Sequence, residues 1–134
     1  SIEDHLFNVK NLPSYKIKRV CIKDSRFINE TERALILRDI VLSTTDKVLV
    51  THGTLTMVDT AKYIGQYKLK KTIILTGSIK LGTDPETDAV ANLQFAIDFI
   101  IDLSYGVYIA MHDQIFTWNN VKKNTTTNQF EKLN

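Results

Sequence analysis

The sequence contains only one cysteine, Cys21, which lies inside an apolar run. A disulfide framework is therefore excluded, and we interpret Cys21 as a buried structural thiol rather than a reactive one. No run of about 18 apolar residues is present, so no transmembrane helix is predicted. No basic segment followed by an apolar one opens the chain, as it would in a signal peptide. From these absences we expect a cytoplasmic protein.

Neither sign of charge predominates, since 17 basic and 15 acidic side chains leave a net charge of +2. So balanced a surface does not favour nucleic acid or a membrane, and we expect neither as a partner. Hydrophobic residues make up 43% of the chain and charged residues 24%, which is typical of a globular protein. A chain of 134 residues is long enough for one domain with its own core, so we predict a single domain over residues 1–134.

Nucleotide-binding motifs are also missing. Gly77 and Gly82 have the spacing of a phosphate-binding loop, but Thr83-Asp84 follows where that loop requires lysine and then serine or threonine. No dinucleotide-binding glycine fingerprint occurs. The sequence therefore gives no support to a nucleotide cofactor.

The chain alternates between strand-like and helix-like segments. Apolar and β-branched runs predict strands, and residues with helical spacing predict the helices between them. A short helix opens the chain, a short return strand is expected at 114–118, and a polar tail with Phe130 as an anchor ends it. The alternation predicts a three-layer α/β fold, a mostly parallel, doubly wound (Rossmann- or flavodoxin-like) sheet with helices on both faces. The main predicted strands are 16–22, 47–50, 71–76 and 106–111, and the main predicted helices are 29–43, 57–67 and 84–104.

Hydroxyl side chains follow three of the predicted strands, at Ser25, Thr54 and Ser78. Ligands of open α/β sheets bind beyond the carboxyl ends of the strands, so we expect these hydroxyls to converge on one crevice. Thr54 belongs to a turn at 51–57, where Gly53 permits a tight bend and the next helix offers free N–H groups to negative charge. In isolation, such a threonine-rich turn is best interpreted as a helix cap.

The ordered motifs nevertheless resemble those of the bacterial-type asparaginase/glutaminase family over nearly the whole chain. The Thr-His-Gly-Thr signature is specific, and the complete set in this order makes the resemblance strong. The end of the chain is most similar to short, single-domain members. The segments that carry the resemblance are Asp24-Ser25, Thr51-His52-Gly53-Thr54, Leu75-Thr76-Gly77-Ser78, Asp88 with Asn92-Leu93, Gly106-Val107-Tyr108-Ile109-Ala110-Met111 and Val121-Lys122-Lys123-Asn124.

The resemblance implies hydrolysis of a side-chain amide, L-asparagine or a related amide, to a carboxylate and ammonia, without a cofactor or a metal. Thr54 matches a catalytic threonine and Lys123 matches the lysine that acts with it. A threonine hydroxyl needs a base to take its proton, and a lysine serves as that base only when its pKa is lowered. Ser25 matches a residue that binds the substrate's α-carboxylate, and the backbone at Ser78 would border the amide. The implied substrate-binding residues are Asp24, Ser25, Gly53, Leu55 and Ser78.

Two departures from the family pattern stand out. The family begins with a strand ending in Thr-Gly-Gly-Thr-Ile, whose threonine is the usual primary nucleophile, and these 134 residues contain no such segment. Leu55 stands where the family has an aspartate that pairs with the substrate's α-ammonium. Because an unpaired buried ammonium costs several kcal/mol, we expect free asparagine to be a poor substrate.

Two other functions compete with an amidohydrolase. The first is a divergent, weak or inactive family member that binds a small carboxylate or amide ligand. Leu55 and the missing nucleophile segment favour this function. The second is a structural or oligomerising domain. It is motivated by Phe95 and Phe99, which widen the apolar face of the helix predicted at 84–104. We expect a homo-oligomer, a dimer or tetramer, although packing of both rings under adjacent elements explains them equally well. A large separation of Lys123 from Thr54 would favour the structural function.

Overall fold

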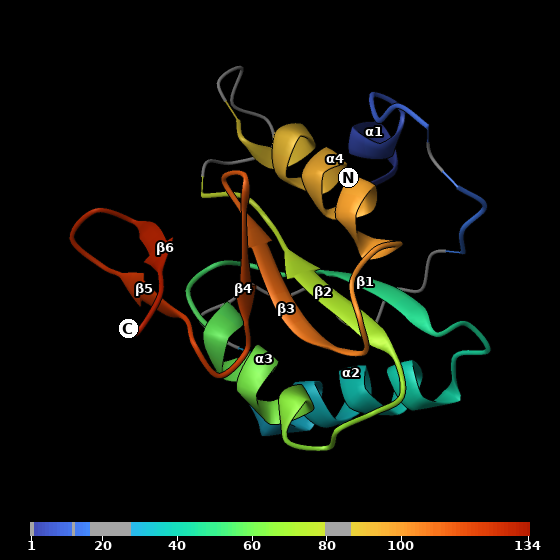
Figure 1. Ribbon diagram of the computed structural model, residues 1–134, viewed down its shortest axis with the longest axis horizontal. Helices are drawn as coiled ribbons and strands as arrows, with labels where there is room; N and C mark the ends of the chain where they lie inside the picture. Colours follow the sequence, from blue (N-terminus) through green and yellow to red (C-terminus); the bar gives the residue numbers. More distant parts are fainter. Residues whose placement is uncertain (1, 12, 17–27, 80–86) are drawn as a thin grey trace.

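The computed structural model describes residues 2–11, 13–16, 28–79 and 87–134 (Figure 1). The strand predicted at 16–22 therefore lies almost entirely outside the described residues. The elements, in chain order, are α1 (Ile2–Leu6), α2 (Glu30–Leu42), β1 (Lys47–Thr51), α3 (Met57–Gly65), β2 (Thr72–Thr76), α4 (Ala89–Ile100), β3 (Gly106–Met111), β4 (Gln114–Thr117), β5 (Lys122–Asn124) and β6 (Gln129–Glu131).

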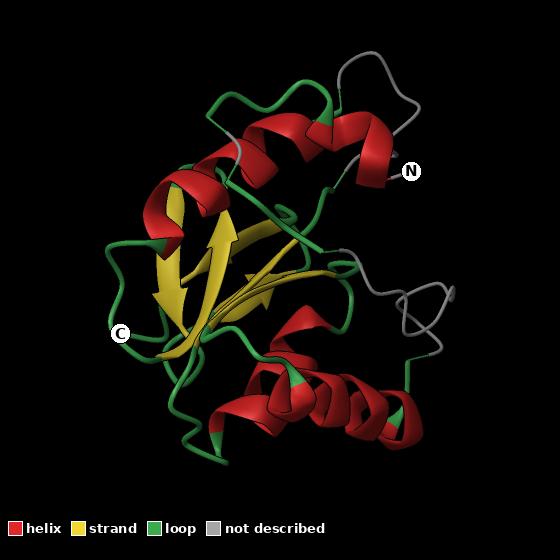
Figure 2. Ribbon diagram, turned by 90° about the vertical axis from the view of Figure 1, so that its right-hand side faces the viewer, coloured by secondary structure: helices red, strands yellow, loops and turns green. Residues whose placement is uncertain are grey.

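The first four strands form one sheet in the order β1-β2-β3-β4. β1, β2 and β3 are parallel to one another, and β4 returns antiparallel to β3. Helices α1 and α4 cover one face of this sheet, and α2 and α3 cover the other (Figures 1 and 2). The predicted three-layer, mostly parallel α/β fold is thus confirmed.

β2 is buried at all five of its positions because it lies between two strands and between two helical layers. Ile73 and Leu75 point to the α2–α3 layer, while Ile74 points to α4, as the two-residue period of a strand requires. On α3 three apolar residues at helical spacing form a stripe that is fully buried against the same sheet face. These are Met57, Ala61 and Ile64.

Helix α4 is shorter than predicted at both ends. It begins at Ala89 after Asp88, whereas the sequence predicted a start at Asp84-Pro85, which lies outside the described residues. It ends at Ile100 rather than near Ser104. The Thr72 hydroxyl donates to the carbonyls of Leu103 and Ser104 at 3.2 and 3.3 Å, which anchors the turn that leads into β3. Ile101, which falls inside the helix predicted at 84–104, lies just past the end of α4 and is 63% exposed.

The polar tail contains a β-hairpin that the sequence did not predict. β5 and β6 pair antiparallel, with Lys123 opposite Phe130, and form a sheet of their own. Phe130 is buried in the main core, so its predicted role as an anchor is confirmed. Each strand has only three residues, so no alternation develops. Asn124 closes the turn of the hairpin, because its side-chain oxygen accepts from the backbone N–H groups of Thr126 and Thr127, the geometry of an Asx turn.

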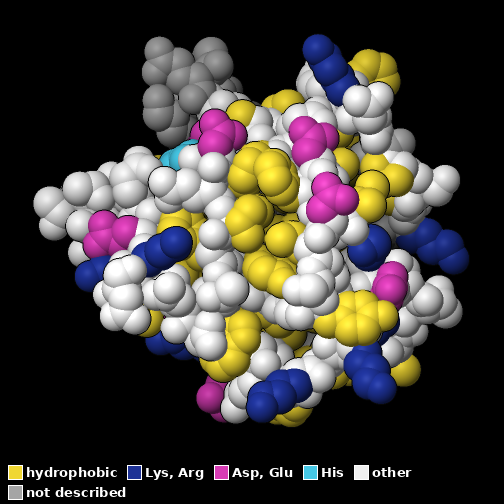
Figure 3. Space-filling model, viewed as in Figure 1, with side chains coloured by type: hydrophobic (Ala, Val, Ile, Leu, Met, Phe, Trp, Pro, Cys, Tyr) yellow, Lys and Arg dark blue, Asp and Glu magenta, His cyan; other side chains and the backbone are white. Residues whose placement is uncertain are grey.

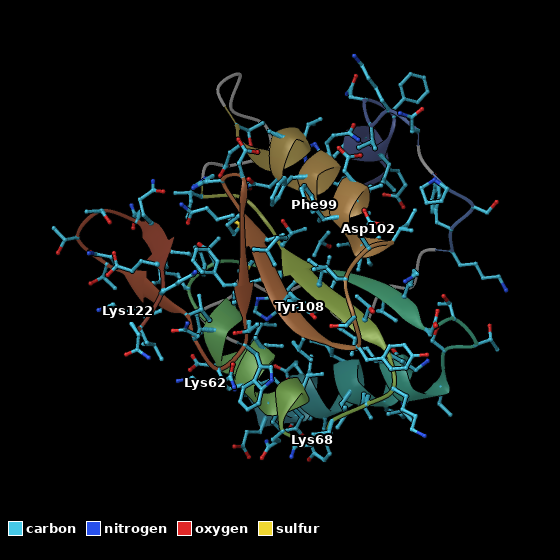
Figure 4. The ribbon with its side chains drawn as sticks, viewed as in Figure 1. Lys62, Lys68, Phe99, Asp102, Tyr108 and Lys122 are labelled. Atoms are coloured by element: carbon cyan, nitrogen blue, oxygen red, sulfur yellow. The ribbon has the colours of Figure 1, made fainter. Side chains whose placement is uncertain are left out.

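The two phenylalanines of α4 differ in burial. Their rings lie with centroids 4.6 Å apart. Phe95 is partly buried against the core, whereas Phe99, which is labelled on α4 in Figure 4, is 43% exposed. Figure 3 shows hydrophobic side chains gathered in the middle of the face that is turned to the viewer in Figure 1. In the described part of the chain, no helix is both long and apolar enough to cross a membrane.

Lys71 ties the end of α2 to the start of β2. Its Nζ donates to the carbonyl oxygens of Ser43 and Thr45 at 2.8 and 2.7 Å, just past the helix end, where the dipole favours a cation. We expect Lys71→Met to lower the free energy of unfolding by about 1–2 kcal/mol, measured by urea denaturation. Lys70→Met is the control, because Lys70 is exposed. Equal stability of the two variants would contradict this role for Lys71.

Candidate active site

The turn between β1 and α3 continues the sheet for one residue and then leaves it. The His52 N–H donates to the Thr76 carbonyl at 2.9 Å, which prolongs the β1–β2 ladder. Thr54 then turns inward and is buried, whereas the side chain of Leu55 is 56% exposed. Thr56 is the N-cap residue of α3, but its side chain makes no capping hydrogen bond. The cap interpretation therefore does not explain the threonines of this turn.

Thr54 and Lys123 meet in the folded chain. The Lys123 Nζ donates to the Thr54 Oγ1 at 2.9 Å across 69 residues of sequence. Burial lowers the pKa of the Lys123 ammonium, since charge is disfavoured away from water. A base and a nucleophile that act together must lie within hydrogen-bond reach of each other, and these two side chains meet that geometric requirement.

The two adjacent lysines of β5 point in opposite directions, as successive residues of a strand must. Lys123 faces Thr54. Lys122 extends from the side of the molecule (Figure 4), and its Nζ lies 3.5 Å from Glu131 on β6. With 54% of its side chain exposed, Lys122 is a charge-matched counterpart of Lys123 outside the site.

A side-chain network holds the hairpin against the ends of β2 and β3. His112, in the turn after β3, lies with Nε2 2.6 Å from an Asp88 carboxylate oxygen and Nδ1 3.1 Å from the Gln129 side-chain oxygen. The Asp88 carboxylate also accepts from the backbone N–H of Ile79, in the loop after β2, and from the side-chain amide of Asn92 on α4. The hairpin that carries Lys123 is thereby linked to the loop that follows β2.

Gly77 lets the two strand-end loops approach each other. A Cβ at this position would lie 2.1 Å from the His52 carbonyl oxygen, far inside van der Waals contact. The segment after β2 consequently lies directly against the Thr54 turn. The close approach of two backbones explains why glycine is needed here.

His52 is held by hydrogen bonds on both ring nitrogens. Its Nδ1 lies 2.7 Å from the Gly53 carbonyl oxygen, and its Nε2 lies 2.9 Å from the Oγ1 of the fully buried Thr60. The pKa of His52 is lowered below 6.5, chiefly by burial, and the nearby Arg33 charge acts in the same direction. The bond to Gly53 and the Asp59 carboxylate oppose this shift.

The lowered pKa of His52 predicts that acid destabilises the fold. The unfolded chain takes up a proton near pH 6.5, while the folded chain keeps His52 neutral, so protons favour unfolding. We expect the free energy of unfolding to fall as the pH drops below 6.5, until the folded pKa is passed. Urea titrations between about pH 7.5 and 5 measure this slope, which His52→Gln should reduce. An unchanged slope in that variant would contradict the prediction.

The structure brings some of the predicted site residues together and leaves others unplaced. Gly53 and Leu55 flank Thr54 in the turn, and Ser78 lies half-buried directly after Gly77. Asp24 and Ser25 lie outside the described residues. Within the described ranges, no group of three or more His, Cys, Asp or Glu side chains is arranged to hold a metal ion.

Sequence reasoning did not assign a role to several residues that organise the site. They come from different elements, so no regular spacing connects them along the chain. Close backbone approach accounts for one of them and shared hydrogen bonds for the others. They are Arg33, His52, Thr60, Gly77, Asp88 and His112.

Residues 1–133 match the family described as "Asparaginase, N-terminal". Among curated proteins, the chain is similar to a probable periplasmic L-asparaginase of Haemophilus influenzae, with 27% identity over 125 residues, covering 89% of this chain and 36% of that protein. It is also similar to an L-asparaginase of Thermococcus kodakarensis, with 31% identity over 94 residues, covering 66% of this chain and 28% of that protein. The chain thus spans about a third of the length of these relatives.

The chain is also similar to solved structures of L-asparaginases. The thermostable L-asparaginase of Thermococcus kodakarensis superposes with a TM-score of 0.88 at 25% identity, covering 99% of this chain and 43% of that one. L-asparaginase I of Vibrio cholerae superposes with a TM-score of 0.83 at 25% identity, covering 95% and 41% of the two chains. Both alignments take in nearly the whole of the fold described above.

Proposed function

Because this chain belongs to the asparaginase family, we propose that it is an amidohydrolase that releases ammonia from a small side-chain amide through Thr54 and Lys123. One observation carries the proposal. The Lys123 Nζ lies 2.9 Å from the Thr54 Oγ1, at the turn that closes the carboxyl end of a parallel strand. We also propose that residues 1–134 act as one domain of the asparaginase N-terminal type.

The proposed reaction begins with neutral Lys123, whose lowered pKa eases loss of its proton to solvent. The amine takes the Thr54 hydroxyl proton as the Oγ1 attacks the amide carbon of the substrate. Backbone N–H groups of the turn oppose the charge that develops on the carbonyl oxygen. The C–N bond then breaks, the nitrogen takes up the proton and leaves as ammonia, and water hydrolyses the threonine ester to free the carboxylate.

Leu55 shapes the choice of substrate. Its side chain adjoins Thr54 and offers no carboxylate to an α-ammonium group. With 56% of its side chain exposed, Leu55 would leave an ammonium beside it partly hydrated, but it would give that ammonium no negative charge as a partner. We therefore propose that the preferred substrates are amides that lack an α-ammonium.

Ammonia release from asparagine and from succinamate, which is asparagine without its α-amino group, tests both statements. We expect kcat/KM for succinamate to exceed that for asparagine by at least about tenfold, since roughly 1.4 kcal/mol of unpaired charge suffices. Leu55→Asp should reverse the preference without changing the fold. Equal rates for both amides in the wild type and in Leu55→Asp would contradict the role of Leu55.

A second candidate is a ligand-binding member without turnover, which the apolar Leu55 beside Thr54 favours. Calorimetry with succinamate separates it from the enzyme. Heat of binding with no ammonia release from any amide would support this candidate and refute the amidohydrolase. Robust turnover would eliminate it.

We further propose a cytoplasmic location and a homo-oligomeric state, a dimer or tetramer. The single cysteine supports the first, because the chain has no disulfide framework. Exposed Phe99 and Ile101 near the end of α4 support the second, since exposed apolar groups mark contacts between chains.

A further inference from the structure

A chain of hydrogen bonds connects α2 to the peptide bond that precedes Thr54. The Arg33 Nε on α2 donates to the Oγ1 of Thr60 on α3 at 3.1 Å. The same oxygen lies 2.9 Å from the His52 Nε2, and the His52 Nδ1 lies 2.7 Å from the Gly53 carbonyl oxygen. Arg33 is itself anchored, because its Nη2 donates to the Ile28 carbonyl at 3.2 Å.

The hydrogens in this series of hydrogen bonds have only one consistent arrangement while His52 is neutral. A carbonyl oxygen only accepts, so the His52 Nδ1 must carry the hydrogen that reaches Gly53. A guanidinium only donates, so the Thr60 oxygen accepts from Arg33 and turns its own hydrogen to the His52 Nε2. His52 is therefore fixed as the Nδ1–H tautomer.

A second proton on His52 conflicts with this arrangement. The Nε2 would become a donor facing the Thr60 oxygen, which already accepts from Arg33, and the Thr60 hydrogen would have to turn away. The imidazolium would also share one oxygen with the guanidinium charge. Two described groups act on a charge at His52: Arg33 opposes it and Asp59 favours it, and the influence of Arg33 is the larger.

The last hydrogen bond of this network, from the His52 Nδ1 to the Gly53 carbonyl, determines how Thr54 is oriented. The described residues contain no cis peptide bond, and in a trans peptide the N–H points opposite to the C=O. The bond from His52 to the Gly53 carbonyl therefore also fixes the direction of the Thr54 N–H. Loss of that bond would free the peptide to rotate and would move the Thr54 hydroxyl relative to Lys123.

We propose that Arg33 is a positioning residue for Thr54: by donating to Thr60 it directs the Thr60 hydroxyl hydrogen to the His52 Nε2, so that the hydrogen of neutral His52 stays on Nδ1 and holds the Gly53–Thr54 peptide in place. The catalytic consequence rests on the proposed amidohydrolase function, whereas the tautomer and its dependence on Arg33 do not. A residue that only joined α2 to α3 would support stability without controlling which nitrogen of neutral His52 carries the hydrogen.

NMR of the ¹⁵N-labelled full chain tests the proposal, because the protein has only three histidines to assign. At about pH 7, multiple-bond ¹⁵N–¹H spectra should show His52 protonated at Nδ1 alone. In Arg33→Met, the Nε2–H tautomer of His52 should appear at the same pH, and protonation of His52 should begin at higher pH. Arg38→Met is the matched control, since Arg38 lies on the same helix with its side chain 62% exposed, and it should leave His52 unchanged.

Two substitutions at Thr60 test the same hydrogen bonds independently, in case Arg33→Met fails to fold. Thr60→Val keeps the shape and removes the oxygen, so it should shift His52 as Arg33→Met does, whereas Thr60→Ser should preserve the wild-type spectrum. His52 signals and a protonation midpoint that are identical in the wild type, Arg33→Met and Thr60→Val would overturn the proposal, whether or not amide hydrolysis is observed. With an active protein, Arg33→Met should lower kcat about 10- to 100-fold with little change in KM.

Discussion

Thr54→Val is expected to lower kcat for amide hydrolysis by at least about 10³-fold, as removal of a catalytic nucleophile does in other hydrolases. Valine keeps the shape of threonine in a buried position but has no Oγ1 to attack the substrate or to accept from Lys123. Thr54→Ser keeps the hydroxyl and should retain much of the rate. Ammonia release under saturating succinamate measures the difference.

The lysines of β5 supply a matched pair for the same assay. Lys123→Met removes the proposed base and should lose activity to a similar extent, whereas Lys122→Met removes an equal charge from the adjacent, exposed position. The wild-type rate should rise with pH through the pKa of Lys123, which burial places below 10.5, because only the neutral amine accepts a proton. Full activity in Thr54→Val, or equal activity of the two lysine variants, would refute the assigned roles.

Gly77→Ala is expected to damage both the fold and the site. The new methyl group would meet the His52 carbonyl oxygen at 2.1 Å. Because this oxygen is part of the backbone and the methyl group is bonded directly to the backbone, one of the two strand-end loops must move. We expect the free energy of unfolding to fall by about 3 kcal/mol, at the upper end for overpacking, together with a large loss of kcat. Urea denaturation and ammonia release measure the two effects.

Gly65→Ala is the comparison for this variant. A Cβ at Gly65 would meet the Trp118 ring at 2.3 Å, which is a side chain rather than backbone. Its ring can shift without displacing the Thr54 turn, so catalysis should suffer less than in Gly77→Ala. A Gly77→Ala protein as stable and as active as the wild type would show that the two loops do not approach as closely as described.

Much of the fold was predictable because its strongest signals are local. The apolar run of β2 indicated a strand covered on both faces, and that strand is fully buried. Met57, Ala61 and Ile64 have the helical spacing that predicted a helix at 57–67, and all three are fully buried. The β5–β6 hairpin escaped prediction because its strands are too short and too polar for a periodic pattern, so only Phe130 marked it.

The candidate site was predictable only in part. Thr54 stands out as the hydroxyl at a strand end, but its pairing with Lys123 spans 69 residues and was expected only from the resemblance to a family. Arg33 and Thr60 lie on separate helices, and nothing in their spacing connects them to His52. The need for glycine at position 77 was equally hard to predict, because it arises from contact with His52, which lies 25 residues earlier in the chain.

Lys123 belongs to a hairpin whose backbone ladder is separate from the four-stranded sheet in the described part of the chain. Buried Phe130 and Val121, together with a few side-chain hydrogen bonds, attach it to the rest of the fold. Elements held in this way open at lower free energy than the core they cover. Amide hydrogens of β5 and β6 should accordingly exchange with solvent before those of β2. Each such opening would separate the lysine from the threonine while the remainder of the molecule stays folded.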